Sequence, residues 1–356
     1  MNLSSFTKSL MKFTENIMGG ADIAVDLGTS LTRIAIPEKG IVLREPTYIG
    51  INTKTSEYIF FGQEAKEIYG KAPQFVDIIK PVEHSIISDF DSGAALMLRY
   101  FRASVYPYFF KSKLLKTKLT AYAAISSSAT EVEQRATEEL LNKAGAQTVF
   151  LIEKTVAASL GAGLSVFANK PVFIIDMGAG LIEMAIIIMG GIVVTKSMKL
   201  GGDHMDRLIA NYLHLKYGII TGVSTCEKLK NTTYSLASDK SVMTVRGKSL
   251  ENGLPKSVRV NSQDLKEALA SNLNQIIDGI KELLEMVPPE TIDGIIKDGI
   301  VLTGQLASIG GIDKFIMQDV KIPVAVAENP QDATIQGILK LISNKEKAKK
   351  IMIKQT

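Results

Sequence analysis

Two stretches of the chain alternate between apolar and polar positions with the period of β-strands. Residues 21–36 form two apolar runs that flank a turn at Gly28, and residues 171–198 repeat this pattern. In the second stretch Asp176 and Gly178 have the same spacing as Asp26 and Gly28. Apolar runs joined by a glycine turn are typical of antiparallel hairpins. The duplication therefore predicts two related domains, each built around one such hairpin.

Helical patterns lie between and after these hairpins. Residues 131–143 have helical periodicity and end at Gly145, and a short strand and a helix of small residues follow. A long helix is predicted over 263–286, because Pro288 and Pro289 stop it. Strand, glycine turn and helix then follow over 299–315, with a strand near 322–327 and a helix over 330–343. The alternation of strands and helices predicts an α/β fold.

Composition narrows the class of protein. A chain of 356 residues suits two domains, and 46% hydrophobic with 22% charged residues is typical of a globular protein. One cysteine and three scattered histidines exclude a disulfide framework and a multi-thiolate metal site. No apolar run reaches the roughly 18 to 20 residues that span a bilayer, and residues 1–18 lack the features of a secretory signal. These features predict a cytoplasmic protein, and a net charge of +4 without a dense basic stripe indicates no nucleic-acid partner.

The repeated Asp-x-Gly turn suits the binding of a polyphosphate. Glycine lets backbone N–H groups approach phosphate oxygens, and an aspartate holds magnesium-bound water. A single Asp-x-Gly sequence is also an ordinary hairpin turn. Its duplication, with a third glycine turn at Gly304, favours the phosphate-binding interpretation.

Eight segments in order resemble the MreB family of bacterial actin-like proteins and cover roughly residues 22–343. They are DLGTSLT at 26–32, GIVLREPTYIGI at 40–51, GQEAKEIYGKAP at 62–73, KPVEHSIISDFD at 80–91, LIEKTVAASLGAGL at 151–164, GGDHMDRLI at 201–209, PPE at 288–290 and VLTG at 301–304.

This resemblance implies an actin-like α/β fold of two related domains and four subdomains that binds ATP or ADP with Mg²⁺ between the domains. Domain I is expected at 21–154 plus 328–343, with a small subdomain near 52–80. Domain II is expected at 155–327, with a small subdomain near 203–260. Residues 1–20 are expected to be an amphipathic segment and 344–356 a basic tail.

The resemblance also implies which residues contact the nucleotide. Those expected to bind it are Asp26, Gly28, Thr29, Ser30, Asp176, Gly178, Ala179, Gly180, Gly202, Asp203, Glu227, Lys230, Gly304 and Gln305. Asp26 and Asp176 would hold Mg²⁺ through water. Glu227 and Lys230 lie on one face of a helix and resemble the family's adenosine-binding pair, although a solvated ion pair is the alternative.

Two departures from the family concern ATP hydrolysis. The family has a catalytic glutamate where this chain has Lys154, and a threonine where it has Leu181. An ammonium cannot accept a proton from the attacking water, and the loss of a general base typically lowers the rate by about 10² to 10⁴. Glu153 could compensate only if its side chain faced the same way, whereas neighbours on a strand face opposite sides. The expectation is nucleotide binding with weak or absent hydrolysis.

Two further departures concern nucleotide binding. The family's triple glycine is reduced to Gly304, Gln305 and Leu306, which adds two Cβ atoms where glycine torsions are often needed. His84 and Ser85 replace an Asp-Gly pair. His84 is interpreted as a residue of a surface turn.

Two segments are candidates for membrane contact. In residues 1–18 an amphipathic helix is predicted, with Phe6, Leu10 and Phe13 on one face. Residues 106–118 combine aromatics, including Phe109 and Phe110, with four lysines, which suits a lipid headgroup region. Packing against the protein itself is the alternative for both segments. The basic residues after 344 are interpreted as a frayed, solvated tail, with an anionic membrane or an acidic partner as alternatives.

The resulting prediction is a filament-forming MreB-like protein at the inner face of the cell membrane. Its expected partners are copies of itself, paralogous MreB-like subunits and the membrane surface. A nucleotide-independent scaffold that copolymerises with an active paralogue stays open as an alternative. A small-molecule kinase of the same superfamily would need an aspartate base and a sugar-binding insertion, neither of which is found, and a chaperone would need a peptide-binding domain beyond the last core helix.

Overall fold

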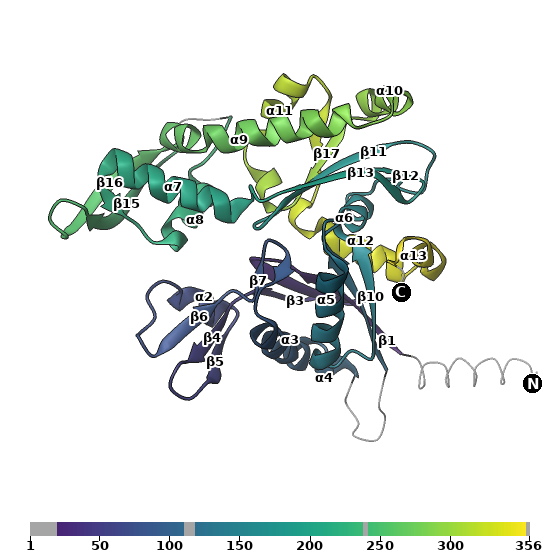
Figure 1. The fold of residues 1–356 in the computed structure, drawn as a ribbon, viewed down its shortest axis with the longest axis horizontal. Coiled ribbons are helices and arrows are strands. Elements are labelled where there is room, and N and C mark those ends of the chain that lie inside the picture. Colours follow the sequence, from purple (N-terminus) through teal and green to yellow (C-terminus); the bar gives the residue numbers. More distant parts are fainter. Residues whose placement is uncertain (1–19, 110–117, 238–240, 354–356) are drawn as a thin grey trace, which may run out of the picture.

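Two five-stranded sheets of matching topology form the centre of the molecule (Figure 1). The computed structural model describes residues 20–109, 118–237 and 241–353. The first sheet has the order β10-β9-β1-β2-β3 and the second has the order β18-β17-β11-β12-β13. In each, a central strand pairs antiparallel with the next strand of its hairpin and parallel with a later strand. The duplicated hairpin pattern of the sequence thus corresponds to two equivalent sheets.

The strands of the two sheets are short, and the inner ones are largely buried. In the first sheet they are β1 Ala21–Leu27, β2 Leu31–Ile36, β3 Gly40–Pro46, β9 Leu119–Ile125 and β10 Thr148–Glu153. In the second they are β11 Val172–Met177, β12 Ile182–Ile188, β13 Gly191–Met198, β17 Ile300–Thr303 and β18 Val324–Val326.

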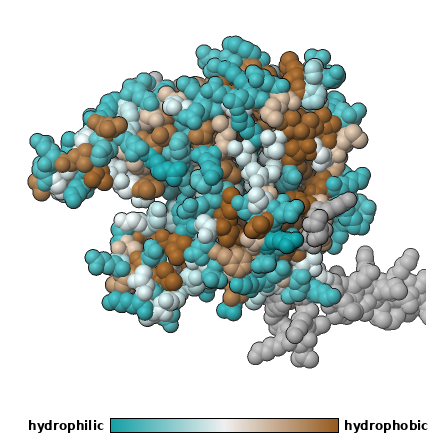
Figure 2. Space-filling view, in the orientation of Figure 1, coloured by the Kyte–Doolittle hydropathy of each residue, from teal (hydrophilic) through white to brown (hydrophobic). Residues whose placement is uncertain are grey.

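Each large sheet is accompanied by a smaller one, and the two small sheets lie on the same side of the molecule (Figure 1). One contains β4 Ile49–Asn52, β5 Glu57–Phe61 and β6 Val76–Ile79, with helix α2 Gln63–Ile68 beside it. The other contains β14 Ile219–Ile220, β15 Val242–Ser249 and β16 Pro255–Asn261, with helices α7 Gly202–Tyr217 and α8 Val223–Thr232 nearby. We call each small sheet with its neighbouring helices an arm. In the space-filling view the molecule is hollowed between the two arms (Figure 2).

Helices α6 and α12 lie between the two large sheets. They span Lys154–Gly161 and Ala333–Ile342 and contribute to an apolar cluster that also contains residues of both sheets. Their backbones approach so closely that a Cβ on Gly161 would lie 1.7 Å from the carbonyl oxygen of Ala333. Any side chain at this glycine would therefore force the helices apart, which makes them a tightly packed link between the halves.

Of the remaining helices, α3, α5, α9 and α13 begin at a side-chain cap. Helix α5 begins with a capping box formed by Thr130 and Glu133, and α9 with one formed by Asn261 and Asp264. The predicted helices over 131–143 and 263–286 are confirmed within about two residues. The bounds are α3 Phe90–Ser104, α4 Tyr106–Phe109, α5 Glu131–Ala144, α9 Ser262–Glu285, α10 Pro289–Asp298, α11 Ile312–Val320 and α13 Lys345–Ile351, with short β7 Val82–Glu83, β8 Ile86–Ile87, η1 Gln305–Ser308 and η2 Pro330–Asp332.

The basic segment after residue 344 is a docked helix, and the interpretation of a frayed tail is wrong for its described part. Helix α13 buries Ala348 and Ile351 in the cluster between the sheets. Lys345 forms an ion pair of 3.1 Å with Asp22, and the Ile353 N–H donates to the Leu151 carbonyl at 3.0 Å. Ala348 and Ile351, three positions apart on the helix, supply the contacts that a purely solvated tail lacks.

The segments predicted to contact a membrane are only partly described. Phe6, Leu10, Phe13 and Phe110 lie outside the described residues. Phe109 ends helix α4 and packs, partly buried, against the core of the first sheet. Within the described ranges, no helix is long and apolar enough to cross a membrane.

Candidate functional site

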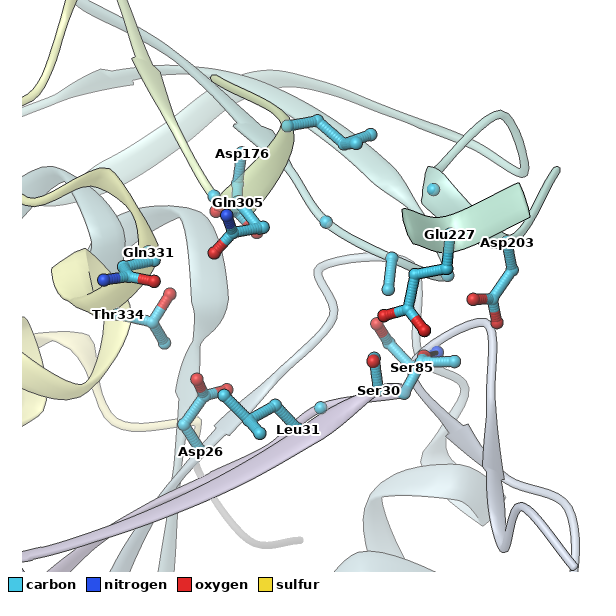
Figure 3. Close-up of a pocket in the computed structure, with 18 of the residues that line it drawn as sticks. Asp26, Ser30, Leu31, Ser85, Asp176, Asp203, Glu227, Gln305, Gln331 and Thr334 are labelled. Carbon is cyan, nitrogen blue, oxygen red and sulfur yellow. Dashed lines mark hydrogen bonds between the residues drawn. The ribbon is translucent and has the colours of Figure 1, made fainter. Parts of the chain in front are cut away.

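Each half of the molecule consists of one large sheet, its small sheet and the helices around them. A cavity of about 330 Å³ lies between the two halves (Figure 3). This volume is within the range of about 300 to 1,000 Å³ of small-molecule sites. All the residues expected from the sequence to bind nucleotide line it, and the carboxylates of Asp26 and Asp176 enter it from opposite halves. The lining residues singled out from the sequence are Asp26, Gly28, Thr29, Ser30, Lys154, Asp176, Gly178, Ala179, Gly180, Gly202, Asp203, Glu227, Lys230, Gly304 and Gln305.

Two hairpin turns with the same backbone hydrogen bond line the cavity, one from each half. We call residues 26–31 the first phosphate loop and residues 176–181 the second phosphate loop. The Gly28 N–H donates to the Leu31 carbonyl at 3.2 Å, and the Gly178 N–H donates to that of Leu181 at 2.9 Å. In both hairpins the aspartate lies opposite the residue seven positions later. Asp26 thus faces Arg33, and Asp176 faces Glu183.

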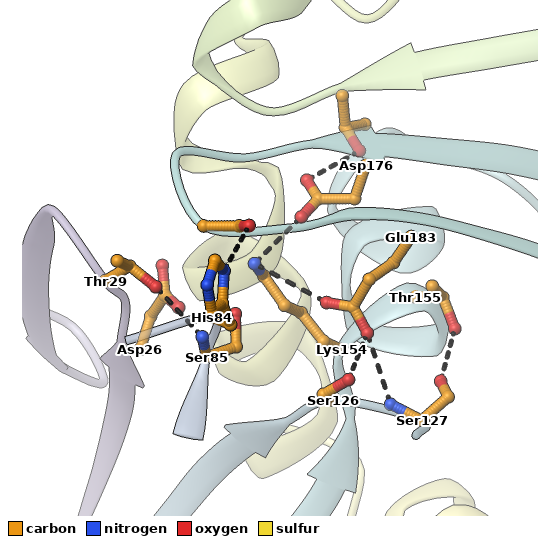
Figure 4. Close-up of polar contacts among 12 residues, drawn as sticks. Asp26, Thr29, His84, Ser85, Ser126, Ser127, Lys154, Thr155, Asp176 and Glu183 are labelled. Carbon is orange, nitrogen blue, oxygen red and sulfur yellow. Dashed lines mark hydrogen bonds and ion pairs between the residues drawn. The ribbon is translucent and has the colours of Figure 1, made fainter. Parts of the chain in front are cut away.

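The two loops touch each other through Thr29, His84 and Ser85. The Ser85 N–H donates to Thr29 Oγ1 at 2.9 Å, and His84 Nδ1 lies 3.1 Å from the carbonyl oxygen of Gly180 (Figure 4). Both His84 and Ser85 have positive φ, at 50° and 61°, in the left-handed region where side chains are disfavoured. His84 is therefore not a simple surface-turn residue, because it contacts the second phosphate loop across the interface.

Lys154 points from the start of α6 into the second phosphate loop. Its ammonium lies 2.9 Å from Asp176 and 3.8 Å from Glu183, and a Cβ on Gly178 would lie 3.7 Å from Nζ (Figure 4). Burial alone would lower the pKa of Lys154, but the carboxylates of Asp176, Glu183 and Asp26 raise it above its ordinary value. The side chain is therefore a fixed cation beside the second phosphate loop.

Two glutamates, the fully buried Glu183 and the partly buried Glu153, belong to the surroundings of Lys154. Glu183 is fully buried and accepts hydrogen bonds from the Ser126 hydroxyl at 2.6 Å and the Ser127 N–H at 3.3 Å. Burial raises the pKa of Glu183, and Lys154 and the Ser126 hydrogen bond counteract the rise. Glu153 has one buried carboxylate oxygen without a hydrogen bond, and burial raises its pKa as well. Unlike Lys154, neither glutamate is among the residues that line the cavity.

The other departures from the family's sequence lie at Leu181 and after Gly304. Leu181 is buried and is not a cavity-lining residue, and its position offers no hydroxyl to water. Gly304 has φ 83°, and a Cβ there would lie 2.4 Å from the Met177 carbonyl oxygen, so glycine is required. Gln305 and Leu306 are not among the positive-φ residues and begin the turn η1 without backbone strain.

The end of the cavity that lies between the two arms contains ion pairs that were not predicted from the sequence. Lys66 of α2 lies 2.8 Å from Glu227 of α8, and Lys80 pairs with Asp203 at the start of α7. Both pairs cross between the two halves. Lys230 does not pair with Glu227, because its buried ammonium lies 2.8 Å from Asp206 and from the Gly202 carbonyl.

At this end of the cavity, Asp206 has a pKa that differs clearly from the ordinary value of an aspartate. Burial raises its pKa to about 6, and Lys230 counteracts part of the rise. Asp206 lies three residues after Asp203 on α7, which is the spacing that places two side chains on one helix face. From this spacing the sequence could have predicted that Asp206 faces the cavity together with Asp203.

The donor set fits a polyanion better than a metal ion. Arg33, Lys66, Lys154 and Lys230 all line the cavity, and glycine backbone forms both loops. Asp26 and Asp176, expected to hold Mg²⁺ through water, are each paired with a cation of the chain, at 3.1 Å and 2.9 Å. In the described ranges there is no group of three or more histidine, cysteine, aspartate or glutamate side chains that could hold a metal ion. These cations and glycine turns therefore fit a nucleotide, and the two aspartates are already engaged by cations of the chain.

Comparison with known proteins agrees with this geometry. The sequence model of the MreB/Mbl protein family matches residues 20–350. The cell shape-determining protein Mbl of Bacillus subtilis is 33% identical over 337 residues, which cover 94% of this chain and 99% of Mbl. The cell shape-determining protein MreB of Escherichia coli K12 is 34% identical over 322 residues, 89% of this chain and 91% of MreB.

Solved structures give the same result. MreB5 of Spiroplasma citri bound to AMPPNP superposes with a TM-score of 0.87 at 29% identity and covers 93% of this chain and 98% of its own. The same protein is also known bound to ADP. A MamK double helical filament has a TM-score of 0.75 at 17% identity, which supports the actin-like fold alone. By sequence over almost its whole length and by fold, this chain belongs to the MreB/Mbl family.

Proposed function

We propose that this protein is an actin-like filament subunit that binds ATP or ADP between its two halves and hydrolyses ATP weakly or not at all. The observation that carries the proposal is the buried ammonium of Lys154, held 2.9 Å from Asp176 beside the second phosphate loop. The nucleotide part is supported by the Spiroplasma relative, which was solved with AMPPNP and with ADP.

Weak hydrolysis follows from the protonation state of Lys154. Its raised pKa keeps the amine protonated at neutral pH, so it cannot remove a proton from an attacking water. The same charge attracts phosphate oxygens and stabilises the bound ground state. An interaction that stabilises substrate without stabilising the transition state further does not accelerate the reaction.

Polymerisation and membrane contact are proposed from family membership and sequence pattern. Identical head-to-tail contacts build an open filament when the rotation between subunits does not close a ring. The apolar residues Phe6, Leu10 and Phe13 would hold the filament at the inner face of the cell membrane. Sedimentation with anionic vesicles, compared between the parent chain and a Phe6→Ser/Leu10→Ser/Phe13→Ser variant, tests this part. Equal sedimentation of the two would rule it out.

A nucleotide-independent scaffold is the second candidate function. The ion pairs Lys66–Glu227 and Lys80–Asp203 and the Thr29–Ser85 hydrogen bond tie the two halves together through the protein's own groups. A cleft closed in this way needs no nucleotide to bridge it. Such a subunit would join filaments of a paralogous MreB-like protein whatever nucleotide is present.

Electron microscopy of the purified protein separates the two candidates. Filaments that need ATP or a non-hydrolysable analogue, with no phosphate release, support the proposed function. Filaments that form equally well without nucleotide support the scaffold. Phosphate release that keeps pace with polymerisation would contradict the proposal of weak hydrolysis.

A further inference from the structure

The two aspartates at the phosphate end of the cavity are each paired with a cation of the chain. Asp26 is bound by the Arg33 guanidinium at 3.1 Å, and Asp176 is bound by the Lys154 ammonium at 2.9 Å. All four side chains are at most 14% exposed. Buried ion pairs at these distances are poorly screened and persist over a wide range of salt.

Each cation also has a second acidic partner, which holds it at the cavity wall. Arg33 Nε donates to Asp332 at 3.0 Å, and Lys154 lies 3.8 Å from Glu183. Arg44 in turn pairs with Asp332. Around the first phosphate loop, two arginines therefore balance two aspartates. Around the second, the single ammonium of Lys154 faces two carboxylates, of which only Asp176 lines the cavity. A hydrated divalent cation would therefore have to compete with a cation of the chain for each cavity-lining aspartate at this end.

The same two cations are positioned toward the phosphate loops. Arg33 and Lys154 both line the cavity, and Lys154 Nζ would lie 3.7 Å from a Cβ on Gly178. An ammonium has three donors, and a guanidinium has five, so each can keep its carboxylate and still donate to a phosphate oxygen. Arginine and lysine are the side chains that most often neutralise phosphates in proteins.

We infer that Arg33 and Lys154 supply the charge neutralisation that Mg²⁺ would otherwise provide, so that this protein binds nucleotides almost independently of Mg²⁺. This inference rests on the proposed function, since it concerns the same nucleotide site. It specifies the ligand as the metal-free polyphosphate of ATP or ADP. The divalent cation becomes dispensable because its ligands are already neutralised.

Equilibrium binding of ADP and of AMPPNP to the full chain tests the inference. Isothermal titration is performed with excess Mg²⁺ and with excess EDTA at equal ionic strength. The dissociation constant of the parent chain should differ by less than about threefold between the two conditions, well below the effect of losing a charged contact. A loss of about tenfold or more in EDTA would overturn the inference.

Charge-removing variants test the residues. Lys154→Gln, and the double variant Arg33→Gln/Lys154→Gln, should weaken binding in EDTA by about tenfold or more and restore a dependence on Mg²⁺, because Asp176 and Asp26 are released. Lys281→Gln is the matched control, since Lys281 pairs at 3.8 Å with Asp319 on an exposed surface. Unchanged binding in EDTA by the double variant would also overturn the inference.

The outcomes separate this inference from the proposed function. If the parent chain binds no nucleotide in either condition, the proposed nucleotide site is wrong. If it binds only with Mg²⁺, the site stands and this inference alone is wrong. Should the variants fail to fold, the comparison of Mg²⁺ with EDTA on the parent chain still decides the question.

Discussion

The Lys154 ammonium lies 2.9 Å from the Asp176 carboxylate, and this contact joins the two halves of the molecule. Lys154 follows the last strand of the first large sheet, and Asp176 is near the end of the central strand of the second. One residue thus combines two effects. It places an ammonium beside the second phosphate loop, and it ties that loop to the helix that packs between the sheets.

Restoring a carboxylate should restore part of the chemistry. We expect Lys154→Glu combined with Leu181→Thr to raise steady-state phosphate release by about tenfold or more over the parent, because a general base contributes about 10² to 10⁴. Lys154→Gln with Leu181→Thr is the control, since an amide is not a base. Equal phosphate release by the parent and both variants would show that these positions do not control hydrolysis.

Removing the Lys154 charge should destabilise the fold. Lys154→Met leaves Glu183, which is fully buried, without its cation, and breaking a buried pair in this way costs about 3 to 5 kcal/mol. Adding Glu183→Gln should recover part of that loss, because the uncompensated charge is removed. Denaturant unfolding of the two single variants and the double variant measures the coupling. Strictly additive effects would contradict a direct interaction.

The buried Asp206 should make stability depend on pH in a specific direction. Its pKa is raised from 3.8 to about 6, so the folded state binds more protons than the unfolded state between these values. Stability from this group is therefore present at low pH and lost as the pH rises through 6, by about 3 kcal/mol at most. Relative to Asp206→Asn, the parent should gain stability as the pH falls from 7 to 5, about one unit on either side of this pKa. A constant difference in melting temperature across that range would contradict this assignment.

The ion pairs across the arms should slow nucleotide release. Lys66 and Glu227 are each a little over a quarter exposed, so breaking their contact costs up to about 1 kcal/mol. We expect Lys66→Ala/Lys80→Ala to accelerate the dissociation of a fluorescent ADP analogue by several-fold in stopped-flow measurements, and Lys281→Ala to leave it unchanged. If the double variant released the analogue at the parent rate, the pairs would have no role in holding the cleft closed.

The central hairpins and the main helices could be predicted because they depend on local patterns, and the cavity-lining residues were implied by the resemblance to the MreB family. Periodicity and glycine turns placed β1, β2, β11 and β12, and proline ended the long helix α9 within about two residues. The cross-strand partner of each aspartate could also have been predicted, because a symmetric hairpin places Asp26 opposite Arg33, seven positions later. The turn residues alone do not indicate this pairing.

Contacts between distant segments could not be predicted. Nothing local in the sequence places Lys66 beside Glu227, 161 positions away, or His84 beside Gly180, 96 positions away. The docking of α13 was missed for a related reason. Its lysines suggested a solvated segment, while Ala348 and Ile351 supply the few apolar contacts that fix it between the sheets.

The most direct test of the account is a single-turnover measurement on the purified protein. Radiolabelled ATP is bound to the full chain, and bound ATP and released phosphate are followed in the same sample over time. ATP is expected to occupy the site, and its γ-phosphate is expected to stay intact for as long as ATP is bound. Stoichiometric conversion of the bound ATP to ADP at the rate of a hydrolysing MreB protein, measured in parallel, would contradict this expectation.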